Sequence, residues 1–203
     1  MLITVLVSCK SYYYVYDVEM IHPVQSKALI YQNDTMSVEF GLEPKDISIT
    51  MTNKTDEGIK INWDDVSFSL FGNANRIVHK ETSYLGHTLA QPSTTIPPHT
   101  KLKDILIRSK DVHFYSAGNN SFLVIDNLFP DYDFGNNRTA TMVAGLKGSQ
   151  INIFLPFYVG ETRISKYYIL SIKDILKYKK NPKNFMLGKT PNQIGSLKVK
   201  TKK

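Results

Sequence analysis

The sequence contains five histidines that could bind a metal or act as bases. They are His22, His79, His87, His99 and His113. Common zinc sites place their ligands at short, fixed spacings, such as two histidines on adjacent turns or a histidine near a pair of cysteines. None of the five has such a neighbour. A site built from His79, His87 and a carboxylate is an alternative, but we predict neither a metal nor a cofactor.

Two pairs of acidic residues could act as the general acid and base of a glycoside hydrolase. That reaction needs two carboxyl groups about 5–10 Å apart across one groove. Asp64 and Asp65 are adjacent, so on a strand they point to opposite faces. Asp131 and Asp133 share a face if extended, but they lie in a stretch of turn composition, residues 129–140. The chain also lacks the usual serine-nucleophile and phosphate-loop motifs. We therefore predict that the protein is not an enzyme, with a hydrolase of unrecognised site as an alternative.

The one cysteine, Cys9, follows the apolar run Leu2–Val7 and the small residue Ser8. This arrangement resembles a bacterial lipobox, in which a small residue before the cleavage point admits the peptidase and the cysteine thiol receives the lipid as a thioether. A complete signal peptide is longer and starts with positive charge. We interpret residues 1–9 as a lipoprotein signal remnant with Cys9 as the lipid-attachment residue. The alternative is an ordinary first strand with a buried cysteine.

The formal net charge of +7 is unevenly distributed. Residues 173–203 contain ten lysines and one acid, which gives +9, so the rest of the chain carries −2. Nucleic-acid-binding domains instead carry basic residues across the folded surface. We predict no nucleic-acid partner and a solvated basic tail over residues 181–203, with loose contact to an anionic surface as the alternative.

The stretch Asp46–Phe71 predicts three consecutive strands, with a hairpin loop at residues 53–58. Apolar and polar residues alternate with the period of two that places one row of side chains on each face of a sheet. The apolar row is Ile47, Ile49, Met51, Ile59, Ile61, Trp63, Val66, Phe68 and Leu70. Such a sheet needs a second layer over its apolar face. This predicts an all-β fold of the β-sandwich type.

Segments with strand character lie on both sides of this unit, and we predict about eight to ten strands for the whole fold. They cover residues 12–20, 28–31, 36–42, 76–79, 102–108, 121–128, 150–159 and 163–172. The stretch Ser121–Leu128 is apolar on both faces and is therefore predicted to be covered on both sides. A short helix from Ser171 is predicted after the last strand.

Aromatic residues could serve either the core or a sugar. Trp63, the only tryptophan, and the row Tyr12–Tyr16 are most simply core and cross-strand residues. The alternative is that they form a stacking platform of a carbohydrate-binding β-sandwich module.

Several segments together resemble a group of small bacterial envelope lipoproteins of unknown function. The segments are Tyr12–Val18, Asn53–Gly72, Arg76–His79, Gln91–Asp104 and Ile151–Asp174. The most specific is the central one, in which Asn-Lys-Thr, a polar turn, an alternating strand, a tryptophan and Ser-Phe follow one another.

The resemblance implies an immunoglobulin-like antiparallel β-sandwich at residues 10–180, export, and lipidation at Cys9. It implies no enzyme. Lys10, the non-acidic residue after the cysteine, is compatible with the outer membrane. The expected function is a non-catalytic interaction or structural module, anchored in the outer membrane by its lipid and facing the periplasm. The expected partners are the membrane and an envelope protein or glycan.

Overall fold

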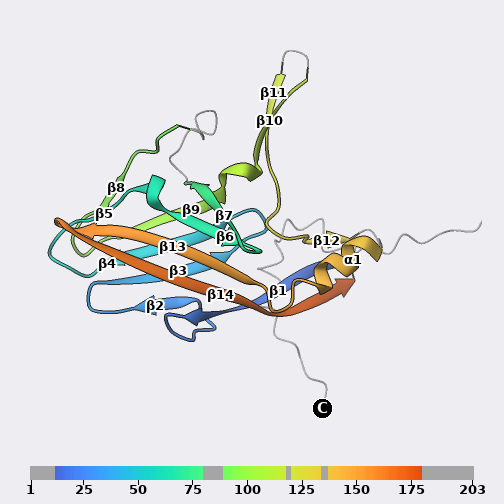
Figure 1. The fold of residues 1–203 in the computed structure, drawn as a ribbon, viewed down its shortest axis with the longest axis horizontal. Helices are drawn as coiled ribbons and strands as arrows, with labels where there is room; N and C mark the ends of the chain where they lie inside the picture. Colours follow the sequence, from blue (N-terminus) through green and yellow to red (C-terminus); the bar gives the residue numbers. More distant parts are fainter. Residues whose placement is uncertain (1–11, 80–88, 118–119, 134–136, 180–203) are drawn as a thin grey trace, which may run out of the picture.

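The computed structural model describes residues 12–79, 89–117, 120–133 and 137–179 (Figure 1). The predicted signal remnant with Cys9, the residues Lys10 and His87, and the predicted tail at 181–203 lie outside these ranges. The described residues contain fourteen strands, one α-helix and short 3₁₀ turns. In chain order the strands are β1 Tyr12–His22, β2 Ile30–Gln32, β3 Met36–Leu42, β4 Ile47–Asn53, β5 Ile59–Ile61, β6 Ser67–Leu70, β7 Asn73–Val78, β8 Thr94–Ile96, β9 Lys101–Arg108, β10 Val112–Ala117, β11 Asn120–Ile125, β12 Tyr132–Asp133, β13 Gln150–Val159 and β14 Thr162–Lys179.

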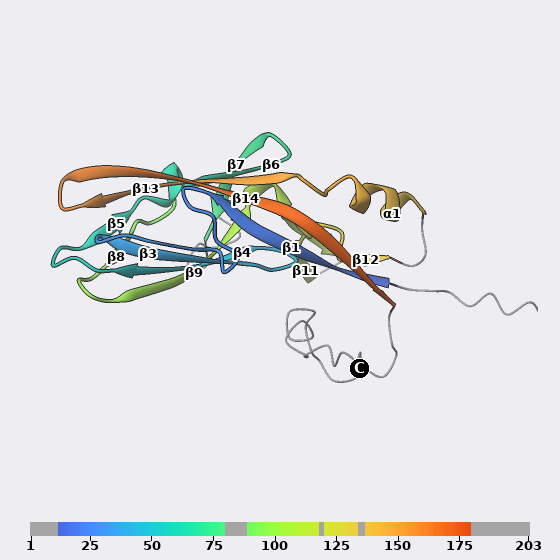
Figure 2. The same ribbon diagram turned by 90° about the horizontal axis from the view of Figure 1, so that it is seen from below.

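Twelve of the fourteen strands form one long curled sheet that folds into two layers, as the view from below in Figure 2 shows. Its order is β12-β1-β14-β13-β6-β7-β9-β4-β3-β2. In addition, β5 pairs with β13 and β8 pairs with β5, and the strand pairs are antiparallel. The layer that contains β13 and β14 lies over the layer that contains β3, β4 and β9. The prediction of an all-β, sandwich-like fold is confirmed, whereas its immunoglobulin-like character remains a prediction.

The apolar row predicted within Asp46–Phe71 is buried throughout. Its nine side chains all belong to the main core, and each is at most 2 % exposed. They share this core with residues of β13 and β14 such as Tyr168, Phe157 and Leu155, which are fully buried. Burial of side chains of this size supplies most of the driving force for folding, so the alternation seen in the sequence determines the face on which the two layers join.

The loop between β4 and β5 is not the predicted hairpin. Strand β4 pairs with β3 and β9, whereas β5 pairs with β13 and β8. The chain therefore crosses from one layer to the other at residues 53–58. The crossing is held by Asn53, whose buried side-chain nitrogen donates hydrogen bonds to the carbonyl oxygens of Glu57, Ile96 and Pro97 at 2.7, 3.0 and 3.1 Å.

The predicted second strand also ends earlier than expected. Trp63 begins a 3₁₀ turn, η1 Trp63–Asp65, that redirects the chain into β6. Its side chain remains on the core side and is fully buried, so the burial prediction for Trp63 is confirmed although its secondary structure is different.

The helix predicted from Ser171 is wrong. Strand β14 continues to Lys179 because β1 pairs with it along its whole second half, up to the register pair Tyr12 and Lys179. A helix, α1 Asn137–Ala144, forms instead in the stretch expected to be irregular. In the described residues no helix is long and apolar enough to cross a membrane.

The prediction that Ser121–Leu128 is covered on both sides is also wrong. Residues 120–125 form β11, which pairs with β10 in a separate two-stranded hairpin that projects from the body of the molecule (Figure 1). Phe122, Leu123 and Val124 are 51, 42 and 38 % exposed.

Candidate functional site

The beginning of β1 and the end of β14 pair at one extremity of the molecule (Figure 1). We call this part the tyrosine end and define it as Tyr12–Tyr16 with Leu176–Lys179. Its register pairs are Tyr12 with Lys179, Tyr13 with Tyr178, Tyr14 with Lys177, Val15 with Leu176 and Tyr16 with Ile175. Directly opposed residues share a face of the sheet, so the tyrosine end presents two faces of different chemistry.

One face combines tyrosines with a lysine. The Lys177 ammonium lies 4.1 Å from the centre of the Tyr12 ring and 5.7 Å from that of Tyr14, which is cation–π geometry. It also lies 3.9 Å from the Oδ2 of Asp133, a carboxylate that accepts a 3.0 Å hydrogen bond from the Tyr14 hydroxyl. Burial, with Asp133 nearby, raises the pKa of Tyr14. The hydroxyl therefore remains protonated and acts as a donor to the buried carboxylate.

The other face is aromatic and apolar. The rings of Tyr13 and Tyr178 stack with centres 5.2 Å apart and planes 13° apart. Burial, with Tyr178 adding to it, raises the pKa of Tyr13. Tyr178 and Leu176 remain 41 and 44 % exposed. This face thus offers large apolar surface with hydroxyl groups at its margin, which is the chemistry of interfaces with proteins and with membrane headgroups.

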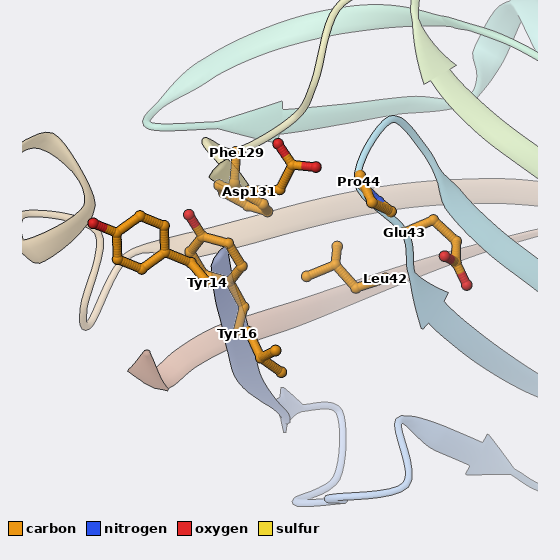
Figure 3. Close-up of a pocket in the computed structure, with 8 residues that line it drawn as sticks. Tyr14, Tyr16, Leu42, Glu43, Pro44, Phe129 and Asp131 are labelled. Carbon is orange, nitrogen blue, oxygen red and sulfur yellow. The ribbon is translucent and has the colours of Figure 1, made fainter. Parts of the chain in front are cut away.

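A small pocket lies behind the tyrosine end (Figure 3). Its volume is about 50 Å³, and its lining is Tyr14, Val15, Tyr16, Leu42, Glu43, Pro44, Phe129 and Asp131. The Tyr16 hydroxyl donates to the carbonyl oxygen of Pro130, and its ring lies 5.0 Å from that of Phe129. Burial raises the pKa of Tyr16. Sites for small-molecule ligands usually measure roughly 300–1,000 Å³, so this pocket has room for a water or two rather than for a substrate.

The paired acids identified in the sequence have structural partners. Asp64 binds the Arg76 guanidinium and accepts the backbone N–H of Gln91 at 3.2 Å. Desolvation opposes ionisation of Asp64, but these contacts outweigh it and lower the pKa. Asp65 accepts a 3.2 Å hydrogen bond from Asn62 and lies 3.9 Å from Arg163. The two carboxylates therefore hold different segments together.

The second acidic pair, Asp131 and Asp133, is also divided between two places. Asp131 lines the small pocket and accepts a 2.6 Å hydrogen bond from Asn127. Asp133 is 2 % exposed beneath the tyrosine end. Among the described residues, the pocket of about 50 Å³ that Asp131 lines does not include Asp133.

Among the histidines, His79 is fully buried. Its partner is Asp104, which the sequence did not indicate. Its Nδ1 lies 3.2 Å from the Oδ2 of buried Asp104, and its ring stacks on Trp63 with centres 4.5 Å apart. Asp104 is 25 positions away in the chain, and only the pairing of β7 with β9 brings the two residues together. His22, His99 and His113 lie elsewhere, and the described residues contain no group of three potential metal ligands.

Trp63 offers no face to a sugar. Its ring is fully buried against His79, and its indole N–H donates a 2.8 Å hydrogen bond to the Thr94 hydroxyl. Within the tyrosine row, Tyr14 is buried, whereas Tyr12, Tyr13 and Tyr16 are partly exposed.

No known protein-family model matches the chain, and a search of curated proteins finds no match.

Proposed function

We propose that this protein is a non-catalytic interaction module of the bacterial cell envelope, attached to a membrane by a lipid on Cys9. The lipobox-like residues Leu6–Cys9 supply the chemical reason for the anchor. The position of the tyrosine end relative to Cys9 is the observation that carries the proposal. Tyr12, the first residue of β1, is only three residues after Cys9, and three extended residues span at most about 10–11 Å.

A lipid on Cys9 would therefore bring the tyrosine end to the membrane surface. The side chains there suit that environment. Tyrosines are enriched where apolar and aqueous phases meet, because one end of the side chain is apolar and the other forms hydrogen bonds. Lysines keep their charge in water while their stems cover apolar surface. Tyr13, Tyr178 and Lys179 fit this pattern.

The lysine distribution supports the same orientation. Three of the ten lysines counted in residues 173–203 belong to β14, at Lys173, Lys177 and Lys179, so part of the basic excess lies on the folded sheet near the tyrosine end. Positive charge at this position favours contact with anionic headgroups, at roughly 1 kcal/mol per basic residue near the surface.

We further propose that the anchored sandwich faces the periplasm from the outer membrane and that its partner is another envelope component. Its immunoglobulin-like character belongs to the same proposal. What supports a binding role rather than a catalytic one is the use of Asp64, Asp65 and Asp133 in structural contacts. A carbohydrate-binding role would have to use the tyrosine end, because Trp63 is buried.

The anchor can be tested by metabolic labelling with radioactive palmitate. The chain is expressed in a Gram-negative host with a host signal sequence joined ahead of Leu2, so that residues 2–9 are retained. We expect a labelled protein in the membrane fraction. A Cys9→Ala variant should be unlabelled and soluble in the periplasm. Equal labelling of both chains, or labelling of neither while both are exported, would contradict the proposal.

A further inference from the structure

The β10–β11 hairpin is fixed at its base and exposed beyond it. At the base, Val112 packs with Val78 and Ile107 in a small apolar cluster of its own. The backbone N–H of Asp126 donates to the carbonyl oxygen of Asp111 at 3.0 Å, and His113 Nε2 lies 3.0 Å from the Asp126 carboxylate. The hairpin is therefore held to the body of the molecule, and Figure 1 shows it projecting from there.

The projecting part is apolar on both faces. Directly opposed residues share a face, and the register places Phe114 opposite Leu123 on one face and Tyr115 opposite Phe122 on the other. Phe114, Tyr115, Phe122, Leu123 and Val124 are between 38 and 56 % exposed. Residues 112–125 contain no Asp, Glu, Lys or Arg, although these make up 21 % of the chain. Solvated hairpins usually carry charge on at least one face, so this composition indicates a contact surface.

The outer edge of β11 is open to strand pairing within the described part of the chain, since β11 pairs only with β10 there. An open edge is a row of backbone N–H and C=O groups ready to pair with another strand, and proteins normally protect it with charge, proline or a bulge. The β11 edge carries the uninterrupted apolar run Phe122–Ile125. Strand addition at this edge would pair the backbone groups of β11 and bring the exposed side chains of β11 against those of the added strand.

We propose that the hairpin is a self-association surface, in which β11 pairs antiparallel with β11 of a second copy of this chain. A two-fold axis between the strands makes the contact self-complementary, and the absence of charge lets two identical surfaces meet without repulsion. The exposed parts of the five apolar side chains amount to roughly 400 Å² per copy, given that large aromatic side chains each carry about 150–250 Å². Pairing along β11 buries part of this surface, on Phe122, Leu123 and Val124, in addition to the paired edges. The side-chain area buried by two copies therefore stays below roughly 800 Å², which is at the weak, transient end of protein interfaces.

A lipid bilayer is a poorer occupant of this surface. In hydrocarbon each unpaired backbone group costs several kcal/mol, which is why open sheet edges do not occur there. The open edge of β11 would carry that cost along its length. Pairing with an identical strand removes it along one edge.

Sedimentation velocity of the full chain tests the proposal. Every sample carries Cys9→Ser, so that neither a lipid nor a disulfide at Cys9 contributes to association. The measured association therefore does not depend on whether the anchor proposal is correct. We expect the sedimentation coefficient to rise with concentration through the micromolar range. Phe122→Lys should remain monomeric, with the dimer weakened at least tenfold. The matched control is Met142→Lys, which adds the same charge to a side chain that is 53 % exposed on α1, and it should dimerise normally.

A second measurement keeps the test valid if Phe122→Lys misfolds. Leu123→Cys in the same background should form a covalent dimer on mild oxidation, whereas Met142→Cys should not. A chain that is monomeric at all concentrations, equal dimerisation of the two lysine variants, or equal cross-linking of the two cysteine variants would overturn the proposal. Flotation of a monomeric chain with phosphatidylcholine vesicles, abolished by Phe122→Lys, would also overturn it and assign the hairpin to the membrane.

Discussion

Trp63 combines three kinds of contact in the core. It stacks on His79, packs in the main core and donates a hydrogen bond to the Thr94 hydroxyl at 2.8 Å. Among the described residues this hydroxyl is the acceptor of the indole N–H, and a buried donor that loses its acceptor carries the full desolvation cost. Stability at this position therefore depends on a hydroxyl in β8, an element of only three residues.

We expect Thr94→Val to lower the free energy of unfolding by about 1–3 kcal/mol, because it keeps the side-chain shape and removes only the acceptor. Urea unfolding followed by the fluorescence of the single tryptophan measures this directly. The neighbouring Thr95→Val changes an exposed residue and should stay within about 0.5 kcal/mol of the parent chain. Equal effects at both positions would show that the hydrogen bond to Trp63 contributes nothing.

Tyr168 presents the opposite case, a buried hydroxyl without a hydrogen-bond partner among the described residues. Its ring makes edge contacts with Phe40 and Tyr31, whose ring centres lie 5.0 and 5.8 Å away. Tyr168→Phe keeps both contacts and removes the unsatisfied group. We expect it to raise the free energy of unfolding by about 1 kcal/mol at neutral pH, measured by urea unfolding. Destabilisation by a similar amount would reveal a partner for the hydroxyl.

The same substitution should change the response to alkali. Burial raises the pKa of Tyr168 above its ordinary value of 10.0. A group whose pKa is higher in the folded state contributes stability that is present below the unfolded pKa and is lost as pH rises above it. The parent chain should therefore lose more stability than Tyr168→Phe between about pH 9 and pH 11. Parallel losses in the two chains would contradict this assignment.

At the scale of elements, the crossing between β4 and β5 depends on a single amide. The side-chain nitrogen of Asn53 serves the carbonyl oxygens of Glu57, Ile96 and Pro97, and the residue is 1 % exposed. Asn53→Asp keeps the shape but places an acceptor, charged at neutral pH, against those oxygens. We expect a loss of more than about 3 kcal/mol. The control Asn73→Asp, at an exposed position in β7, should change stability by less than about 0.5 kcal/mol. Comparable losses would mean that the crossing does not rely on Asn53.

Local patterns in the sequence predicted the elements that lie between the two layers. In β4, β6 and β13 the alternation of side chains coincides with burial, because one face of each strand meets the core. The end of β14 was mispredicted because apolar residues from Ile164 to Leu176 also fit helical spacing. Pairing with β1, more than 150 residues earlier, decides the conformation there, and a local window does not contain that information. The helix α1 buries only Val143, so its periodic signal was weak.

The sequence also predicted only part of the candidate site. The tyrosines of β1 and the burial of Trp63 followed from residue type and alternation. The hydrogen bond between Tyr14 and Asp133 joins residues 119 positions apart, and that between His79 and Asp104 joins residues 25 apart. Such contacts are set by the order of strands in the sheet, which spacing along the chain does not specify. The sequence did not predict the exposure of β11. An apolar run indicates that its side chains contact other apolar groups, but it does not indicate whether those groups belong to the same molecule or to a second one.

At the scale of the whole molecule, the sheet order puts the start of β1 and the end of β14 side by side, while the turn between β13 and β14 lies at the opposite extremity (Figures 1 and 2). Leu176 of β14 is 15 positions after Glu161, which lies in the turn before β14, and 15 extended residues span roughly 50 Å at about 3.3 Å per residue. An anchor at Cys9 adjacent to the tyrosine end would therefore hold the opposite turn far from the membrane. The long axis of the sandwich would then point away from the membrane surface.

This orientation gives a prediction for the lipidated protein in vesicles. Spin labels are placed at Leu176→Cys and, as a control, at Glu161→Cys, both at exposed positions, and Cys9 is blocked by its lipid. Membrane-dissolved oxygen should relax the label at 176 more strongly than the label at 161, and a water-soluble nickel complex should show the reverse preference. Adding Tyr13→Ser and Tyr178→Ser to the Leu176→Cys chain should reduce its oxygen exposure, because the stacked pair provides much of the apolar surface that faces the headgroups.

Equal oxygen and nickel exposure at 176 and 161 would show that the molecule lies flat on the membrane or does not contact it. The tyrosine end would then have to be assigned to a protein partner.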